Sequence, residues 1–174
     1  MSVYMRIDKL DTIKGAATLT DVGGKKGLMA VDSFDWGAGR AIHVEVGSAS
    51  HPDTGSIAFS DISIHRSVDG ASPYLQTFFY QPGDNGRDVE ILITKPDRKG
   101  DGEVPSMVIT LEAARLTSYA ISGSSASPSE SLTLVYTSIA VVHYIEEGDG
   151  TIVKSDTVKY DLPTAKLSSA AKLP

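Results

Sequence analysis

The sequence is organised around Asp69-Gly-Ala-Ser-Pro-Tyr-Leu-Gln-Thr-Phe-Phe-Tyr-Gln-Pro-Gly83, the one stretch whose pattern predicts a helix. Ser72 is a favourable N-cap, and Pro73 suits the first helical position, where an N–H would have no helical partner. One apolar stripe is formed by Tyr74, Leu75, Phe78 and Phe79, and Pro82-Gly83 ends the helix. We therefore predict a helix over about 72–81. Because so short a helix is marginal alone in water, it must pack on another element.

The rest of the chain alternates apolar and polar residues with the period of β-strands. The expected strands are Val3–Ile7, 28–36, 57–66, 88–94, 106–121, 130–146 and 152–162, with a projecting hairpin over about 40–55. The inward phase changes near Ser60-Asp61 and again near Thr137-Ser138, as β-bulges would explain. Long strands that change phase are typical of a curled sheet. The pattern predicts a mainly β fold: a closed or nearly closed β-barrel of two sheets with one flanking helix.

Length and composition limit the function classes. A chain of 174 residues is most simply one domain, expected over 1–162, followed by a loosely ordered tail over 163–174. The net charge of −6 argues against nucleic acid or an anionic membrane as the main partner. The absence of cysteine excludes disulfides and thiolate sites. With no signal-peptide pattern and no apolar run long enough to span a bilayer, we expect synthesis in the cytoplasm without membrane insertion.

No motif predicts an active site, a metal site or a cofactor site. The histidines at 43, 51, 65 and 143 show neither H-x-x-x-H nor H-E-x-x-H spacing. Gly23–Gly27 lacks the spacing of a phosphate-binding loop, and residues 97–103 lack that of a calcium loop. The carboxylates are scattered, without a pair placed as general acid and base. We therefore expect a protein that is not an enzyme and needs no cofactor.

Four segments, taken in order, resemble the Hcp family, the haemolysin-coregulated tube proteins of bacterial type VI secretion. The segments are Phe34-Asp-Trp-Gly37, Phe59–Leu75, Ile109–Gly123 and Glu130–Tyr144. Each segment alone is a weak sign of the family, but the order and spacing of all four are specific to it. The resemblance extends from the first strand to about Leu162.

The resemblance implies a homohexameric ring built from small β-barrel subunits with one flanking helix. Rings stack into a tube that a contractile sheath propels, with a spike protein at its tip and small effectors in its lumen. It also implies secretion by the type VI machinery to the exterior or into target cells, with roles in virulence and bacterial competition.

Several residues follow from this resemblance as predicted contacts. Residues 40–54 are expected to contact the neighbouring ring, with Arg40, His43, Glu45, His51 and Asp53 as candidates. Tyr74 and Tyr80 are candidates for the contact between subunits, and Asp35, opposite Phe34 on its strand, for the lumen wall. The predicted structural residues are Trp36, Ser72, Pro73, Leu75 and Phe78.

Two other functions stay open on the sequence alone. One is a monomeric β-barrel module that binds a sugar or a lipid, although a single tryptophan and 7% aromatic residues give little surface for sugar stacking. The other is a hydrolase whose site is assembled from distant residues, which no motif supports.

Overall fold

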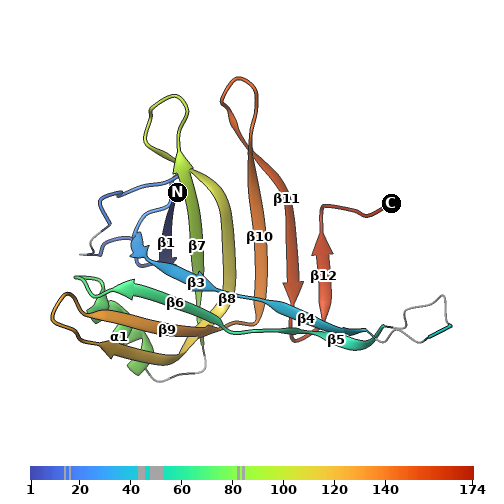
Figure 1. Cartoon of the computed structure of the whole chain (residues 1–174), viewed down its shortest axis with the longest axis horizontal. Coiled ribbons are helices and arrows are strands. Elements are labelled where there is room, and N and C mark those ends of the chain that lie inside the picture. Colours follow the sequence, from blue (N-terminus) through green and yellow to red (C-terminus); the bar gives the residue numbers. More distant parts are fainter. Residues whose placement is uncertain (14, 16, 43–45, 48–52, 82, 84) are drawn as a thin grey trace.

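The structure is a computed structural model that describes residues 1–13, 15, 17–42, 46–47, 53–81, 83 and 85–174. These residues form one helix, α1 (Ser72–Tyr80), and twelve strands (Figure 1). The strands are β1 (Ser2–Ile7), β2 (Met29–Val31), β3 (Ser33–Asp35), β4 (Ala38–Ile42), β5 (Asp53–Phe59), β6 (Ile62–Ser67), β7 (Arg87–Pro96), β8 (Glu103–Ser122), β9 (Ser129–Val135), β10 (Ser138–Glu146), β11 (Ile152–Asp161) and β12 (Lys166–Ser169). The predicted mainly β fold with one short helix is confirmed.

Two layers of strands cross at a steep angle and share β8. The upright layer in Figure 1 has the order β12-β11-β10-β8-β7-β1-β2, and the crossing layer is β3-β6-β9. The first part of the 20-residue β8 pairs with β7 and β10, and from Arg115 onward it pairs with β9. One long strand therefore carries the chain from one layer into the other.

The bend in β8 lies at Ala113, whose φ of 49° is unusual for a residue with a side chain. The Asp88 carboxylate accepts the Ala113 N–H at 3.1 Å and so holds the bend. Gly86 packs against it so closely that a Cβ at this position would lie 2.2 Å from the Ala113 carbonyl carbon. Only glycine fits there.

Residues 29–35 bring the two ends of the curled sheet together. β2 pairs with β1, β3 pairs with β6, and between them Asp32 N–H donates to the His65 carbonyl at 2.9 Å. The ends meet through a change of strand partner, and in the described part of the chain no single ladder closes. Of the two predicted forms, a closed or a nearly closed barrel, the described strands therefore fit the nearly closed one.

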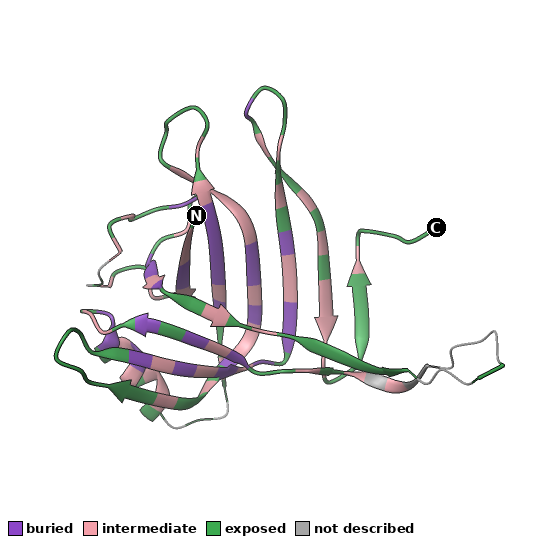
Figure 2. Ribbon diagram, in the orientation of Figure 1, coloured by how far each residue is buried: buried purple, intermediate pink, exposed green. Residues whose placement is uncertain are grey.

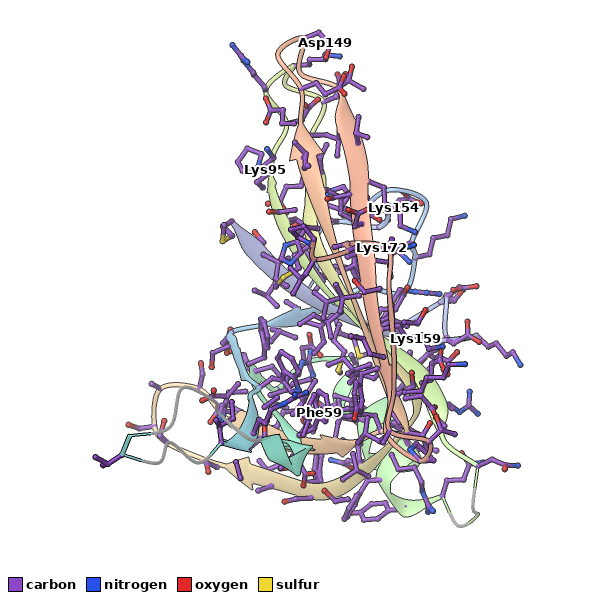
Figure 3. The ribbon with its side chains drawn as sticks, turned by 90° about the vertical axis from the view of Figure 1, so that its right-hand side faces the viewer. Phe59, Lys95, Asp149, Lys154, Lys159 and Lys172 are labelled. Atoms are coloured by element: carbon purple, nitrogen blue, oxygen red, sulfur yellow. The ribbon has the colours of Figure 1, made fainter. Side chains whose placement is uncertain are left out.

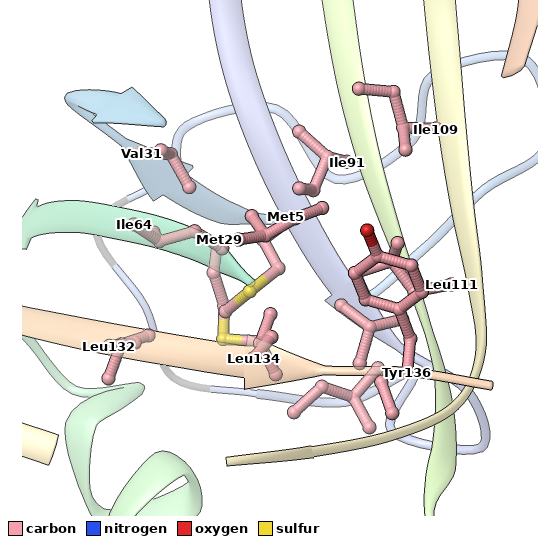
Figure 4. Packing of buried hydrophobic residues seen from close by; sticks show 14 of the residues in the cluster. Met5, Met29, Val31, Ile64, Ile91, Ile109, Leu111, Leu132, Leu134 and Tyr136 are labelled. Carbon is pink, nitrogen blue, oxygen red and sulfur yellow. The ribbon is translucent and has the colours of Figure 1, made fainter. Parts of the chain in front are cut away.

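The core fills the space between the two layers (Figure 4). Met5, Ile91 and Leu111 from the upright layer face Ile64 and Leu134 from the crossing layer, all of them buried. Burial of such side chains contributes roughly 1.5–3 kcal/mol each. A smaller cluster on the outer side of the upright layer packs the segment before β2 onto β1 and β7; it comprises Tyr4, Val22, Leu28, Leu92 and Val108.

Both predicted phase changes are real, but they are strand breaks rather than bulges. At residues 60–61 the chain leaves β5, which pairs with β4, and enters β6, which pairs with β3 and β9. At residues 136–137 it passes from β9 in the crossing layer to β10 in the upright layer. Alternation alone cannot distinguish a bulge from a change of sheet, because both reverse the inward phase.

The start of α1 differs from the prediction. The N-cap is Ala71, so Ser72 is the first helical residue and Pro73 the second. Ser72 is buried, and its hydroxyl donates to Glu130 Oε1 at 3.0 Å and accepts the Asp69 N–H at 3.1 Å. The Asp69 carboxylate accepts the Ala71 N–H at 2.8 Å. The predicted N-cap role of Ser72 is therefore wrong, and its side chain instead forms a buried link to β9.

The expected loose tail is wrong for residues 166–169, which form β12 and pair with β11. The ladder runs from Val158↔Ser169 to Asp161↔Lys166, so β12 extends the upright layer by one strand. No helix in the described residues is long and apolar enough to cross a membrane.

Candidate functional site

The described residues contain no cluster suited to metal binding. Nowhere among them do three or more histidine, aspartate or glutamate side chains gather to hold an ion. The features that distinguish this molecule are two exposed sheet faces of opposite chemistry, together with the ion cluster that docks the helix.

The outward side of the crossing layer is a surface of small hydroxyl side chains. Cross-strand partners lie on the same side of a sheet, and the pairing gives three rows across β3, β6, β9 and the second part of β8. This hydroxyl face consists of Ser33, Asp35, Ser63, His65, Ser67, Ser118, Ala120, Ser122, Ser129, Ser131 and Thr133. All of these side chains are exposed or partly exposed, and none is a large apolar group.

Charge on the hydroxyl face is sparse. Its only carboxylate, Asp35, is exposed at one edge, while the neighbouring Phe34 and Trp36 pack against the core. The imidazole of His65 is exposed, with Nδ1 3.2 Å from the Ser131 hydroxyl. This face can form many weak hydrogen bonds, and it stays hydrated when nothing is bound.

The second exposed face is apolar and lies over β10, β11 and β12. β11 and β12 contain no fully buried residue (Figure 2). Val141 pairs with Val158, and Ile145 pairs with Val153. We define the open apolar face as Met107, Val141, Ile145, Val153, Val158 and Leu167; it also carries one exposed polar side chain, His143, the cross-strand partner of Met107. Ile145 is 56% exposed and Leu167 61% exposed, so this face continues the core surface without a layer above it.

A buried ion cluster docks α1 onto the crossing layer. The Arg66 side chain is fully buried, forms an ion pair with the equally buried Glu130, and lies 2.7 Å from Asp69 Oδ2. Arg66 Nε donates to the Ala30 carbonyl at 3.0 Å. Tyr119 donates its hydroxyl proton to Glu130 Oε2 at 2.5 Å, and burial, followed by this hydrogen bond, raises the pKa of Tyr119. The cluster connects β2, β6, β8, β9 and the helix.

A partly buried ion group holds the segment before β2. Glu90 on β7 accepts from Arg6 at 2.6 Å and from Lys25 at 2.5 Å. Burial acts to raise the pKa of Glu90, but the hydrogen bonds from Lys25 and Arg6 outweigh it and lower that pKa. Glu90 is therefore ionised, and it fastens Lys25 to the outer side of the sheet.

Trp36, predicted to be structural, packs at the base of the β4–β5 hairpin. Its Nε1–H donates to the Tyr136 hydroxyl at 2.8 Å, and that hydroxyl donates to the Ser60 carbonyl at 2.9 Å. Its ring stacks at 6.3 Å on Phe59, which in turn lies 4.8 Å from the Tyr160 ring. Since Trp36 packs within the protein, it is no open platform for stacking a sugar.

The predicted contact residues lie apart from one another. Arg40 is exposed on β4, and Asp53 is the first residue of β5, opposite Ile42. Tyr80, at the end of α1, is 69% exposed, whereas Tyr74 is only partly exposed. Leu75 is buried, and Phe78 packs partly buried against the core. His43, Glu45 and His51 lie outside the described residues.

The sequence predictions named only Asp35 on the hydroxyl face and no residue of the open apolar face. The sequence did contain a signal for the hydroxyl face, because polar residues alternate there with apolar ones at period two. These polar residues are Ser63, His65 and Ser67 in one strand and Ser129, Ser131 and Thr133 in another. The apolar face had no distinguishing signal, since exposed and buried valines look alike in sequence.

Comparison with known proteins places this fold. The family model described as Hcp, a type VI secretion system effector, matches residues 4–143. A solved structure described as a type six secretion system protein is similar with a TM-score of 0.76 and 23% identity, covering 96% of this chain and 99% of that one. The crystal structure of Hcp1 from Salmonella typhimurium is similar with a TM-score of 0.66 and 16% identity, covering 97% of this chain and 100% of that one.

A more distant likeness extends to phage-like machines. The 6-fold symmetrised baseplate of the anti-feeding prophage contains a chain that is similar with a TM-score of 0.52 and 14% identity, covering 81% of this chain and 91% of that one. At these identities the structural matches show the fold alone. No curated protein matches the chain significantly by sequence.

Because the family model spans most of the chain and the solved structures share its fold, the chain belongs to the Hcp family, whose members are structural tube proteins exported by the type VI secretion system and not enzymes.

Proposed function

We propose that this chain forms six-membered rings that stack into the type VI secretion tube, with the hydroxyl face lining the channel. The observation that carries the proposal is the contrast between the hydroxyl face and the open apolar face on one protomer. One face suits contact with water and passing cargo, and the other suits burial against protein.

The hydroxyl face fits a channel wall because it is polar without being strongly charged. Net hydrogen bonds of neutral groups contribute only about 0.5–1.5 kcal/mol each, so cargo is held weakly and can be released. Asp35 and His65 are the ionisable members of this face, and at its edge the exposed Asp32 carboxylate accepts from the Ser67 hydroxyl at 3.2 Å. These three groups are the candidates for selecting cargo by charge.

The open apolar face fits a contact between subunits. A closed ring needs heterologous interfaces, in which one surface of a subunit meets a different surface of its neighbour. Leaving Ile145 and Leu167 exposed to water would be unfavourable, and covering them removes that cost. The partner we propose is a second copy of this chain.

The β4–β5 hairpin and the end of α1 are proposed as further contacts. The hairpin extends beyond the crossing layer (Figure 1), so residues 40–54, including Arg40 and Asp53, are candidates for contact with the next ring. Exposed Tyr80 is a candidate for contact between subunits. The spike, the sheath and small effectors are the proposed further partners, in accordance with the family.

Single-cysteine labelling tests the two faces, because the chain has no cysteine of its own. Asp35→Cys probes the hydroxyl face, Val158→Cys the open apolar face, and Lys26→Cys, exposed on the opposite side of the sheet, is the control. Each variant is treated with a small maleimide and with a maleimide coupled to a globular protein, before and after disassembly in denaturant.

We expect stacked rings to show a distinct pattern for each position. Asp35→Cys should react with the small reagent alone, Val158→Cys with neither, and Lys26→Cys with both. Labelling of Asp35→Cys by the bulky reagent in intact tubes would exclude the channel assignment. Equally fast labelling of Val158→Cys before and after disassembly would exclude the proposed contact.

A further inference from the structure

A hollow of about 520 Å³ lies at the C-terminal end of α1. Its walls come from the end of β1, the end of the helix, the start of β7 and the bend of β8, and they include Lys9, Phe78, Gln81, Arg87, Asp88 and Arg115. We call this hollow the helix-end groove.

The groove gathers three cations that form no ion pair in the described part of the chain, beside the two carboxylates of Asp8 and Asp88. Arg6, Arg66 and Arg98 form ion pairs, and Arg40 also has a partner. In the part of the chain that the structure describes, Arg87 and Arg115 are the two arginines without such a pair, and both line this groove. Lys9, which also forms no ion pair with a described residue, is the third cation that lines the groove. Guanidinium groups bind carboxylates in a two-pronged manner, so two free arginines in one hollow suit a carboxylate-bearing segment.

The groove is built on firm backbone. Gly86 and Ala113 are in close contact, and the nearby Asp88 carboxylate is engaged by the Ala113 N–H at 3.1 Å. The Asp88 carboxylate therefore stabilises the bend of β8 through this hydrogen bond. Both arginines are held on paired strands. Arg87, the first residue of β7, pairs with Ala114, and Arg115, just after the bend inside β8, pairs with Val135.

The opposite end of the molecule is acidic. The turns between β7 and β8 and between β10 and β11 both lie at the far end of the upright layer from α1 (Figure 1), and Asp149 marks this end in Figure 3. A Cβ on Gly150 would lie 3.2 Å from Lys99 Cε, so the two turns are adjacent. Residues 95–103 and 146–150 carry six carboxylates and three cations. The carboxylates of Asp101 and Glu147 are exposed.

We infer that the acidic turns of one copy dock into the helix-end groove of the next, a head-to-tail contact between protomers. The ten residues of β7 separate the two surfaces by about 30 Å, so one protomer cannot join them itself. A contact between two different surfaces repeats from copy to copy and can close a ring. The inference rests on the proposed assembly of this chain and specifies which charged surfaces meet in it.

A charge exchange tests the contact directly. The groove variant is Arg87→Glu/Arg115→Glu, the turn variant is Asp101→Lys/Glu147→Lys, and Lys26→Glu/Lys172→Glu is the matched control outside the groove. Assembly is followed by native mass measurement and light scattering, and folding by circular dichroism. Should the groove variant lose its fold, Arg87→Met/Arg115→Met measures the same contact without repulsion.

We expect the wild type and the control to assemble, and each reversed variant alone to need at least about tenfold more protein, because like charges then face each other. An equal mixture of the two variants should assemble again, since every contact between unlike variants regains opposite charges. Assembly of the groove variant at the wild-type concentration, or failure of the mixture to assemble, would overturn the inference. A wild type that stays monomeric would overturn the proposed function itself, and the inference with it.

Discussion

The two ends of α1 use arginine in opposite ways. At the N-terminal end, Arg66 is fully buried and paired with Glu130 and Asp69. At the C-terminal end, Arg87 and Arg115 are exposed around a hollow, and neither has an ion pair in the described structure. A satisfied, buried arginine fixes the fold, because the protein must keep its partners in place. An exposed arginine without a partner is free to contact another molecule.

This difference separates residues that maintain the protomer from residues proposed to join protomers. Substitutions at the N-terminal end of α1 should lower the free energy of unfolding. Substitutions at the C-terminal end should leave it nearly unchanged and alter assembly.

Leu75→Asp should have the largest effect, because it places a charge in the core midway between the two ends of the helix. An unpaired buried charge destabilises by more than about 4 kcal/mol, so the protomer should unfold. Thermal unfolding followed by circular dichroism measures this. Tyr80→Asp, at the exposed end of the same helix, is the control and should retain the fold while weakening assembly. Equal melting temperatures for the two variants would contradict the account.

Arg66→Met should destabilise by about 3–5 kcal/mol, because it leaves Glu130 and Asp69 in the interior without their cation. Urea unfolding measures the change. The matched control is Lys159→Met, which breaks the Lys159–Glu112 pair, whose side chains are 39% and 41% exposed. It should cost no more than about 1 kcal/mol. If the two variants lose the same stability, burial is not what makes the Arg66 cluster important.

Glu90→Gln tests the intermediate, partly buried case through its pH dependence. The folded-state pKa of Glu90 is lowered from 4.5, so its stabilisation is fully present above that value and is lost as the pH falls through the lower folded-state value. The variant should be about 1–2 kcal/mol less stable at pH 7. This difference should shrink toward zero in acid, as unfolding at a series of pH values would measure. A difference that stays constant from neutral to acidic pH would show that ionisation of Glu90 is not responsible.

Arg87→Met/Arg115→Met should have the smallest effect on the protomer, within about 0.5 kcal/mol, because both side chains are exposed. The same variant should raise the protein concentration needed for assembly. Urea unfolding and light scattering on one preparation separate the two quantities. A large loss of stability would show that Arg87 and Arg115, like Arg66, stabilise the folded protomer, and would contradict the proposed difference between the two ends of α1.

The helix and the strands could be predicted from local pattern. Ser72-Pro73 followed by an apolar stripe places α1 within one residue of its observed end, Tyr80. The role of Ser72 could not be predicted, because its hydroxyl bonds to Glu130, 58 residues away. The same limit applies at residues 60–61 and 136–137, where the pattern gives the phase change but not the new partner strand.

The buried ion cluster carried a signal that pattern analysis could have used. Arg66 continues the inward phase of Ile62 and Ile64, and Glu130 begins that of Leu132 and Leu134. Two opposite charges in inward phase predict a buried pair. The helix-end groove had no comparable signal, because Lys9, Arg87 and Arg115 are distant in sequence and meet only through the bend at Ala113.

The central claim, that this Hcp-family chain works as a tube subunit, is tested most directly by native mass measurement of the wild-type protein combined with negative-stain microscopy. The account predicts a species of six times 18.4 kDa, six-fold rings in the images, and stacked rings at higher concentration. A monodisperse monomer of 18.4 kDa at all concentrations would contradict it and would favour a monomeric binding module instead.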